Sequence, residues 1–174
     1  MLDVFEAIEN RRSIRAFFEK PVREEQVKRL IEAAINAPSA GNIQPWEFII
    51  VRDPEMKQKL SLAALNQDFI AEAPVVVVVC ADGARSGRRY AERGVSLYCI
   101  QDTAAAIQNM LLAAHAMGLG TCWVGAFKED MASKALKTPS SVRPIAIIPV
   151  GYPREKPASR RKRPFEEIVH QEVF

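Results

Sequence analysis

APVVVVVCAD, residues 73–82, decides the fold of this chain. It contains five consecutive valines and has no polar side chain before Asp82. A strand with one face in water alternates apolar and polar residues, whereas a strand buried on both faces is apolar throughout. The apolar run is also too short to cross a bilayer. We therefore expect a central strand in a sheet that helices cover on both faces.

Helix and strand signals alternate on both sides of this strand. Helices are expected within residues 2–12, 21–37, 54–65, 97–117 and 128–136. Further strands are expected within residues 46–53 and 144–153, and a short strand or turn within residues 121–127. Residues 84–94 read as a polar connection, and Pro149 suggests that the last strand has an edge position or a bulge. The alternation predicts one α/β or α+β domain.

Composition narrows the class of protein. The chain has 174 residues and a net charge of +3, and six of its 24 basic residues lie within residues 154–163. Such a stretch is usually a solvated tail, and a nucleic-acid patch is the alternative, although no aromatic side chain interleaves these charges. Three widely spaced cysteines and two distant histidines favour neither a disulfide framework nor a zinc site. With no secretory leader in sight, we expect a cytoplasmic protein outside the membrane.

Three arginines and a serine crowd the segment RRSIRAF, residues 11–17. Like charges this close repel one another unless an anion lies among them, and the planar fork of arginine suits phosphate. The Ser13 hydroxyl adds another donor. The segment therefore predicts an anion site, and the alternative is an exposed basic turn with surface ion pairs.

A polar loop follows the second expected helix. APSAGNIQPWEF, residues 37–48, places several hydrogen-bonding side chains between a helix and a strand. Trp46 adds a flat apolar face with one donor. This loop is a candidate for ligand contact, and a capped helix end followed by a core tryptophan is the alternative.

The glycine-rich segment GLGTCWVGAF, residues 118–127, is another candidate. It follows a helix, whereas a dinucleotide fingerprint follows a strand. Helix termination accounts for Gly118 and Gly120 but not for Gly125, which instead suggests close approach of the backbone to a flat ligand. Cys122 has an apolar setting and no histidine nearby in sequence, so we interpret it as a packed thiol rather than a nucleophile.

Four parts of the chain, taken in order, resemble the nitroreductase family of FMN-dependent oxidoreductases. They are RRSIRAF (11–17), APSAGNIQPWEF (37–48), QDTAAAIQNMLLAAHAMGLGTCWVGAF (101–127), and PVGYP with RRKRPFEEIV (149–153 and 160–169). The resemblance implies an α+β fold in which helices wrap a mixed sheet, as one domain over residues 1–174. It also implies an intertwined homodimer with FMN at the interface. Residues 152–174 would then form a tail that packs on the partner subunit.

The resemblance further implies which residues bind FMN. In chain order they are Arg11, Arg12, Ser13, Arg15, Pro38, Ser39, Asn42, Gln44, Gln67, Cys122, Trp123, Val124, Gly125, Arg161 and Arg163. The first four and the last two would hold the phosphate, with Arg160 as a substitute in a register shifted by one residue. Those in 38–44 would reach the flavin from the partner subunit, and those in 122–125 would lie beside the isoalloxazine. Asn66 lies next to Gln67 in a region that often contacts the polar edge of the ring.

The implied activity is transfer of hydride from NADH or NADPH through FMN to a nitroaromatic, a quinone or a similar oxidant. The flavin carries the redox chemistry, so no side chain need act as a nucleophile. Val124 stands where larger relatives often carry a glutamate, so this chain lacks that carboxylate. The alternatives are flavin fragmentation, dehalogenation, oxidation of peptide-bound heterocycles, a flavin-binding protein without turnover, and a nucleic-acid-binding module built on the basic tail.

Overall fold

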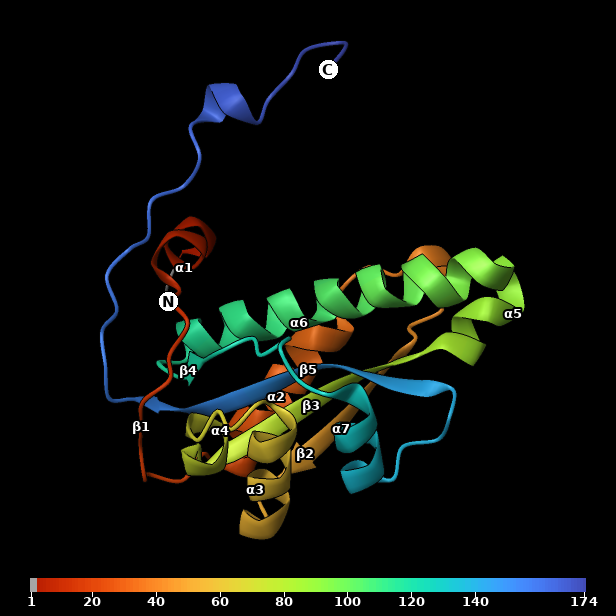
Figure 1. The fold of residues 1–174 in the computed structure, drawn as a ribbon. Helices are drawn as coiled ribbons and strands as arrows, with labels where there is room; N and C mark the ends of the chain where they lie inside the picture. Colours follow the sequence, from red (N-terminus) through yellow and green to blue (C-terminus); the bar gives the residue numbers. More distant parts are fainter. Residues whose placement is uncertain (1–2) are drawn as a thin grey trace.

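The computed structural model describes residues 3–174, so Leu2, part of the first expected helix, lies outside the described residues. A sheet lies at the centre with strand order β1-β5-β3-β2, and β4 also pairs with β5 (Figure 1). The strands are β1 (Phe17–Phe18), β2 (Trp46–Val51), β3 (Val75–Asp82), β4 (Gly120–Thr121) and β5 (Val142–Pro153). The α-helices are α1 (Val4–Asn10), α2 (Glu24–Ile35), α3 (Pro54–Ala63), α4 (Phe69–Glu72), α5 (Gly83–Arg93), α6 (Cys99–Ala116) and α7 (Glu129–Leu136).

The valine strand β3 is buried on both faces, as predicted. Every side chain from Val75 to Ala81 is at most 1% exposed. Successive side chains of a strand point to opposite faces. Val75, Val77 and Val79 therefore pack in the cluster formed with α2 and α6. The alternate residues Val76, Val78 and Cys80 pack in the cluster formed with α3, α4 and α7.

The α+β class is confirmed. All four pairings between the named strands are antiparallel, and an isolated bridge between Ser13 and Thr121 is parallel. The edge position suggested by Pro149 is wrong, because β5 lies between β3 and β4. On the side of β5 that faces β4, Ile147 exchanges two backbone hydrogen bonds with Val124. Pro149 follows two residues along the strand, so its nitrogen faces the same side. The pairing is interrupted there between Thr121 and Val124, so the missing N–H breaks no bond.

Residues 84–94, expected as a polar connection, instead form most of α5. The side chain of Asp82 caps this helix by accepting the N–H of Arg85 at 3.0 Å. The helix is too exposed to carry a clear apolar stripe, which is why periodicity missed it. It breaks at Ala91, where φ is 47°, and a π-helical turn, Gly94–Tyr98, then leads into α6.

The long helix α6 confirms the helix expected over 97–117. Its buried face includes Ile107, Met110 and Ala114, while Gln101 and Gln108 remain exposed on the opposite side. Gly118 follows with φ of 72°, the left-handed conformation that ends a helix, as predicted.

The C-terminal tail leaves the body of the protein, whereas α1 lies beside the end of α6 (Figure 1). The helix α1 begins with a capping box of Asp3 and Glu6, but its apolar residues Phe5 and Ile8 are exposed. The tail also carries exposed apolar side chains, including Phe165, which is 68% exposed. Exposed apolar side chains thus gather on α1 and on the tail.

Candidate functional site

The segment Arg11–Arg15 is tied to the end of the sheet. The backbone N–H of Ile14 donates to the carbonyl of Thr121 at 2.9 Å. Gly120 makes this close approach possible, because a Cβ there would lie 2.9 Å from the side chain of Ile14. The segment therefore has a fixed position between α1 and β1.

The predicted phosphate residues of this segment gather around one cavity of about 660 Å³. Arg11, Arg12, Ser13 and Arg15 line it together with Arg160 and Lys162 of the tail. Five basic side chains thus face Glu9, the single acidic residue of the lining. A hollow with this charge balance favours an anion, and arginine forks with a serine hydroxyl suit phosphate.

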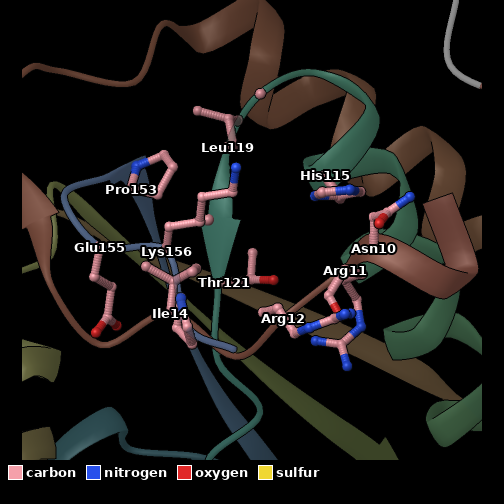
Figure 2. Close-up of a pocket in the computed structure, with 13 residues that line it drawn as sticks. Asn10, Arg11, Arg12, Ile14, His115, Leu119, Thr121, Pro153, Glu155 and Lys156 are labelled. Atoms are coloured by element: carbon pink, nitrogen blue, oxygen red, sulfur yellow. The ribbon is translucent and has the colours of Figure 1, made fainter. Parts of the chain in front are cut away.

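An adjoining cavity of about 470 Å³ shares Arg11 and Arg12 (Figure 2). Asn10 and His115 lie above the two arginines in this view, while Pro153, Glu155 and Lys156 form the opposite wall. Burial, followed by the charges of Arg11 and Arg12, lowers the pKa of His115. The imidazole is therefore neutral near pH 7 and adds no charge to the arginine cluster.

Glu155 was missed by sequence reasoning, although it holds the arginine segment in place. Its Oε1 accepts the backbone N–H of Arg15 and, at 3.1 Å, that of Ala16. These bonds fix the backbone from which the Arg15 side chain projects. No motif separates this glutamate from the other charges of a basic tail, and only the fold brings the two segments together.

The glycine-rich segment lies beside the arginine segment. The side chains of Cys122 and Val124 are buried, whereas Trp123 and Gly125 are exposed. The backbone of Val124 exchanges two 3.0 Å hydrogen bonds with Ile147. Of the four predicted residues, Trp123 and Gly125 are therefore the two that present atoms to a ligand from outside.

Cys122 is a packed thiol in this structure. Burial raises the pKa of the Cys122 thiol, while the charge of Arg15 and a hydrogen bond with Ser13 oppose that shift without cancelling it. The thiol is therefore protonated at neutral pH and is a poor nucleophile.

Replacing Cys122 with serine is expected to retain most of the NAD(P)H oxidation of the FMN-loaded protein. Hydride transfer through a flavin needs no thiolate, and serine keeps nearly the same volume. Steady-state assays on samples matched for FMN content measure the effect. Complete loss of turnover in a folded, FMN-loaded variant would revive covalent catalysis by this thiol.

Gln67 contacts the end of the glycine-rich segment. Its Nε2 donates to the carbonyl of Ala126 at 3.2 Å and to that of Ala64 at 2.8 Å. Asn66 is exposed, and both it and Leu65 have φ near 60°. Consecutive non-glycine residues in this region are strained by about 1–3 kcal/mol each, and such strain gathers at functional sites.

The loop Pro38–Gln44 does not reach the arginine segment within one chain. The N–H of Ala40 donates to Asp102 near the start of α6 at 3.1 Å, whereas His115 and the arginines lie at the other end. Thirteen residues of helix correspond to about 20 Å. The alternative reading of Trp46 as a core side chain is confirmed, because it is buried.

The loop is nevertheless tightly organised. Asn42 and Gln44 both have φ near 55°, and the N–H of Gln44 donates to Oγ of Ser39 at 3.0 Å. The amide of Gln44 also donates to Oδ1 of Asn42 at 3.0 Å. These bonds hold two non-glycine residues in a left-handed conformation on an exposed loop.

The two arginines predicted in the tail lie apart from this cavity. Arg163 pairs with Glu167 at 3.5 Å and also donates to the carbonyl of that residue. Neither Arg161 nor Arg163 lines the cavity, whereas Arg160 and Lys162 do. The register shifted by one residue is therefore the one that faces the arginine cluster in this single chain.

Residues 3–174 contain no group of three or more histidine, cysteine, aspartate or glutamate side chains that could hold a metal ion. Within the same range, no helix combines the length and apolar character that a membrane crossing requires.

Comparison with known proteins agrees with this arrangement. The sequence model of the nitroreductase family matches residues 8–67 and 57–152, which together make up most of the chain. This chain belongs to the nitroreductase family.

Individual relatives cover nearly the whole chain. A Methanothermobacter thermautotrophicus protein, whose provisional name pairs NADH dehydrogenase with NAD(P)H nitroreductase, is 37% identical over 163 residues, which are 91% of this chain and 82% of that protein. FMN reductase (NADPH) of Bacillus subtilis is 30% identical over 187 residues, 100% of this chain and 75% of that enzyme. The structure of the NADPH:FMN oxidoreductase of Vibrio harveyi with NAD+ has a TM-score of 0.91 at 27% identity, covering 98% of this chain and 77% of that one.

Gly125 has no internal reason to be glycine in this nitroreductase-family chain. A Cβ there would meet only the indole of Trp123, at 3.7 Å, and the backbone is not in the left-handed region. A residue kept small without a packing reason is explained by a ligand that approaches its backbone closely.

Replacing Gly125 with alanine is therefore expected to leave thermal stability nearly unchanged while weakening FMN binding by about tenfold or more, the equivalent of one lost hydrogen bond. Thermal unfolding of the FMN-free protein and FMN titration measure the two effects. Gly118→Ala, in the left-handed position after α6, is the matched contrast and is expected to lower stability. Unchanged FMN affinity in Gly125→Ala would remove this segment from the site.

Proposed function

We propose that this chain binds FMN and transfers hydride from NADH or NADPH through the flavin to a small oxidant such as a nitroaromatic or a quinone. The observation that carries this proposal is the cavity lined by Arg11, Arg12, Ser13 and Arg15, whose segment is bonded to Thr121 of the glycine-rich segment through the N–H of Ile14. The names of the relatives, which include an FMN reductase and an NADPH:FMN oxidoreductase, support it.

The donor set of the site fits FMN. The phosphate of FMN is a dianion, and the basic lining of the cavity offers several arginine forks with a serine hydroxyl. The flat ring needs backbone N–H donors that the chain itself does not use. Within residues 3–174, the exposed N–H of Gly125 makes no hydrogen bond. The residues present thus supply a cationic anchor for the phosphate and a backbone donor for the ring.

When bound, FMN accepts hydride from the reductant and passes it to the oxidant. The task of this chain is to bind and orient the cofactor. Arg11, Arg12 and Arg15 hold the phosphate end, and Ser13 donates its hydroxyl hydrogen there. The unused N–H of Gly125 would favour negative charge on the ring. Val124, with both backbone groups engaged by Ile147, contributes no carboxylate for proton supply.

The complete site requires two chains in this proposal. The loop Pro38–Gln44 is held at the far end of α6 from the arginine segment, so a partner subunit would bring its own loop to this cavity. Exposed apolar residues on α1 and on the tail support an intertwined dimer, because large apolar surfaces of this kind are usually covered. We further propose that Arg161 and Arg163 reach phosphate in that assembly.

A reducing compartment such as the cytoplasm is the proposed location. Cys80, Cys99 and Cys122 are all buried and unpaired. Unpaired cysteines of this kind are typical of proteins kept in reducing surroundings.

Steady-state oxidation of NADH and NADPH, with nitrofurazone or menadione as the oxidant, tests the proposed activity. We expect turnover that depends on FMN and on the oxidant, with ping-pong kinetics. A protein that stays yellow but does not oxidise either reductant would instead be a flavin-binding protein. Consumption of FMN during the reaction would identify flavin fragmentation and contradict the proposed oxidant class.

A further inference from the structure

A second arginine cluster lies at the opposite end of α6 from the first (Figure 1). Its members are the exposed residues Arg85, Arg88, Arg89 and Arg93 of α5. In the part of the chain that the structure describes, none of them forms an ion pair with a carboxylate. Like charges on neighbouring turns of a helix destabilise it, so four uncompensated guanidinium groups indicate an anion from outside the chain.

Two of these arginines join α5 to the loop Pro38–Gln44. Nε of Arg85 donates to the carbonyl of Ile43 at 2.6 Å, and Nη1 of Arg89 donates to that of Gly41 at 3.3 Å. Gly41 has φ of 55°, and a Cβ there would lie 2.6 Å from the hydroxyl oxygen of Tyr90. The loop and the helix therefore form one unit.

The remaining donors of the cluster are free to bind a ligand. Arg88 makes no hydrogen bond within residues 3–174, and Arg85 and Arg89 each use one of their five N–H groups in this way. Positions 85, 88 and 89 share one face of the helix, because residues three and four apart are neighbours. Unused guanidinium donors thus lie beside the loop that is proposed to reach the flavin.

We propose that α5 binds the phosphate groups of the reductant dinucleotide. This inference rests on the proposed function. The first arginine cluster is assigned to the phosphate of FMN, so the second cluster requires a different anion. The reductant of the proposed reaction is such an anion. The pyrophosphate of NADH and NADPH carries two negative charges, and NADPH adds a 2′-phosphate. Arg85 and Arg89, which bond to Ile43 and Gly41, would hold these groups beside the loop Pro38–Gln44.

Nucleic acid is a poorer match for this surface. Tyr90 and Tyr98 pack edge to face with ring centroids 5.1 Å apart. The guanidinium of Arg93 lies 5.2 Å from the centre of the Tyr98 ring and donates to its hydroxyl at 2.9 Å. The aromatic rings near the cluster are thus engaged with one another and are not free to stack on bases.

Arg88→Glu tests the proposal, because the Arg88 side chain makes no hydrogen bond or ion pair within residues 3–174. The FMN-loaded protein is titrated with NADP+ and with NAD+ by calorimetry. We expect binding to weaken by about tenfold in Arg88→Glu and by less in Arg88→Gln, as for a lost charge-assisted contact. FMN affinity and kcat at saturating reductant stay unchanged while KM rises. An equal loss of affinity for NAD+ and NADP+ would assign Arg88 to the pyrophosphate, whereas a loss of affinity for NADP+ alone would assign it to the 2′-phosphate.

The matched control is Arg29→Glu on α2, an exposed arginine with the same charge change. Unchanged NADP+ and NAD+ affinity in Arg88→Glu would overturn the proposal, as would equal weakening in the control. The two proposals fail separately. A wild-type protein without FMN or turnover contradicts the proposed function, whereas an active protein indifferent to Arg88 contradicts only this assignment.

Discussion

Truncation after Ser159 is expected to remove most of the bound FMN and to destabilise the proposed dimer in the same sample. The tail contributes Arg160 and Lys162 to the cavity lining. It also carries apolar side chains, including Phe165 and Ile168, that stay exposed in the single chain. Burying a large apolar side chain contributes roughly 1.5–3 kcal/mol, so several of them on a partner subunit would stabilise the dimer substantially.

Light scattering and the ratio of flavin to protein absorbance measure both effects of the truncation together. The double variant Arg160→Gln with Lys162→Gln is the matched control, since it removes charge but keeps the apolar anchor. It is expected to weaken FMN binding while remaining dimeric. A truncated protein that is still fully dimeric and fully yellow would refute the coupled role of the tail.

Arg15→Ala is expected to weaken FMN binding by about ten- to 150-fold, which corresponds to roughly 1.5–3 kcal/mol for a lost charge-assisted contact. Arg15 is exposed, lines the cavity and lies 5.9 Å from the ring centre of Phe69. Its backbone is fixed by Glu155, so the substitution removes the side chain without loosening the segment.

Titration of the FMN-free protein with FMN measures this change directly. Arg15→Lys keeps the charge but loses the fork, so it is expected to fall between alanine and the wild type. Arg29→Ala on α2 should have no effect. An unchanged dissociation constant in Arg15→Ala would reject the assignment of this residue to phosphate.

The elements predicted best from sequence are those with a clear apolar pattern. The unbroken valines of β3 predicted burial on both faces, and Gly118 predicted the end of α6. The helix α5 was not predicted, because a capped, exposed helix rich in arginine has no apolar stripe. The position of β5 in the sheet was also predicted wrongly. Pro149 shows that one backbone donor is missing, but not whether the strand on that side needs a donor at this position.

The arginine segment and the glycine-rich segment were predicted as site candidates, and the structure places them side by side. Sequence spacing could not predict Glu155 or the cavity position of Lys162, since both depend on the path of the tail. It also could not distinguish side chains that face the core from those that face outward. Cys122 and Val124 were predicted together with Trp123 and Gly125, yet burial separates the two pairs.

The visible absorption spectrum of the purified protein tests the central claim most directly. We predict a yellow protein with the two absorption bands of oxidised flavin, which bleach on addition of NADH or NADPH under anaerobic conditions and return when a quinone is added. A colourless protein that binds no FMN even when an excess of the cofactor is supplied would contradict the account.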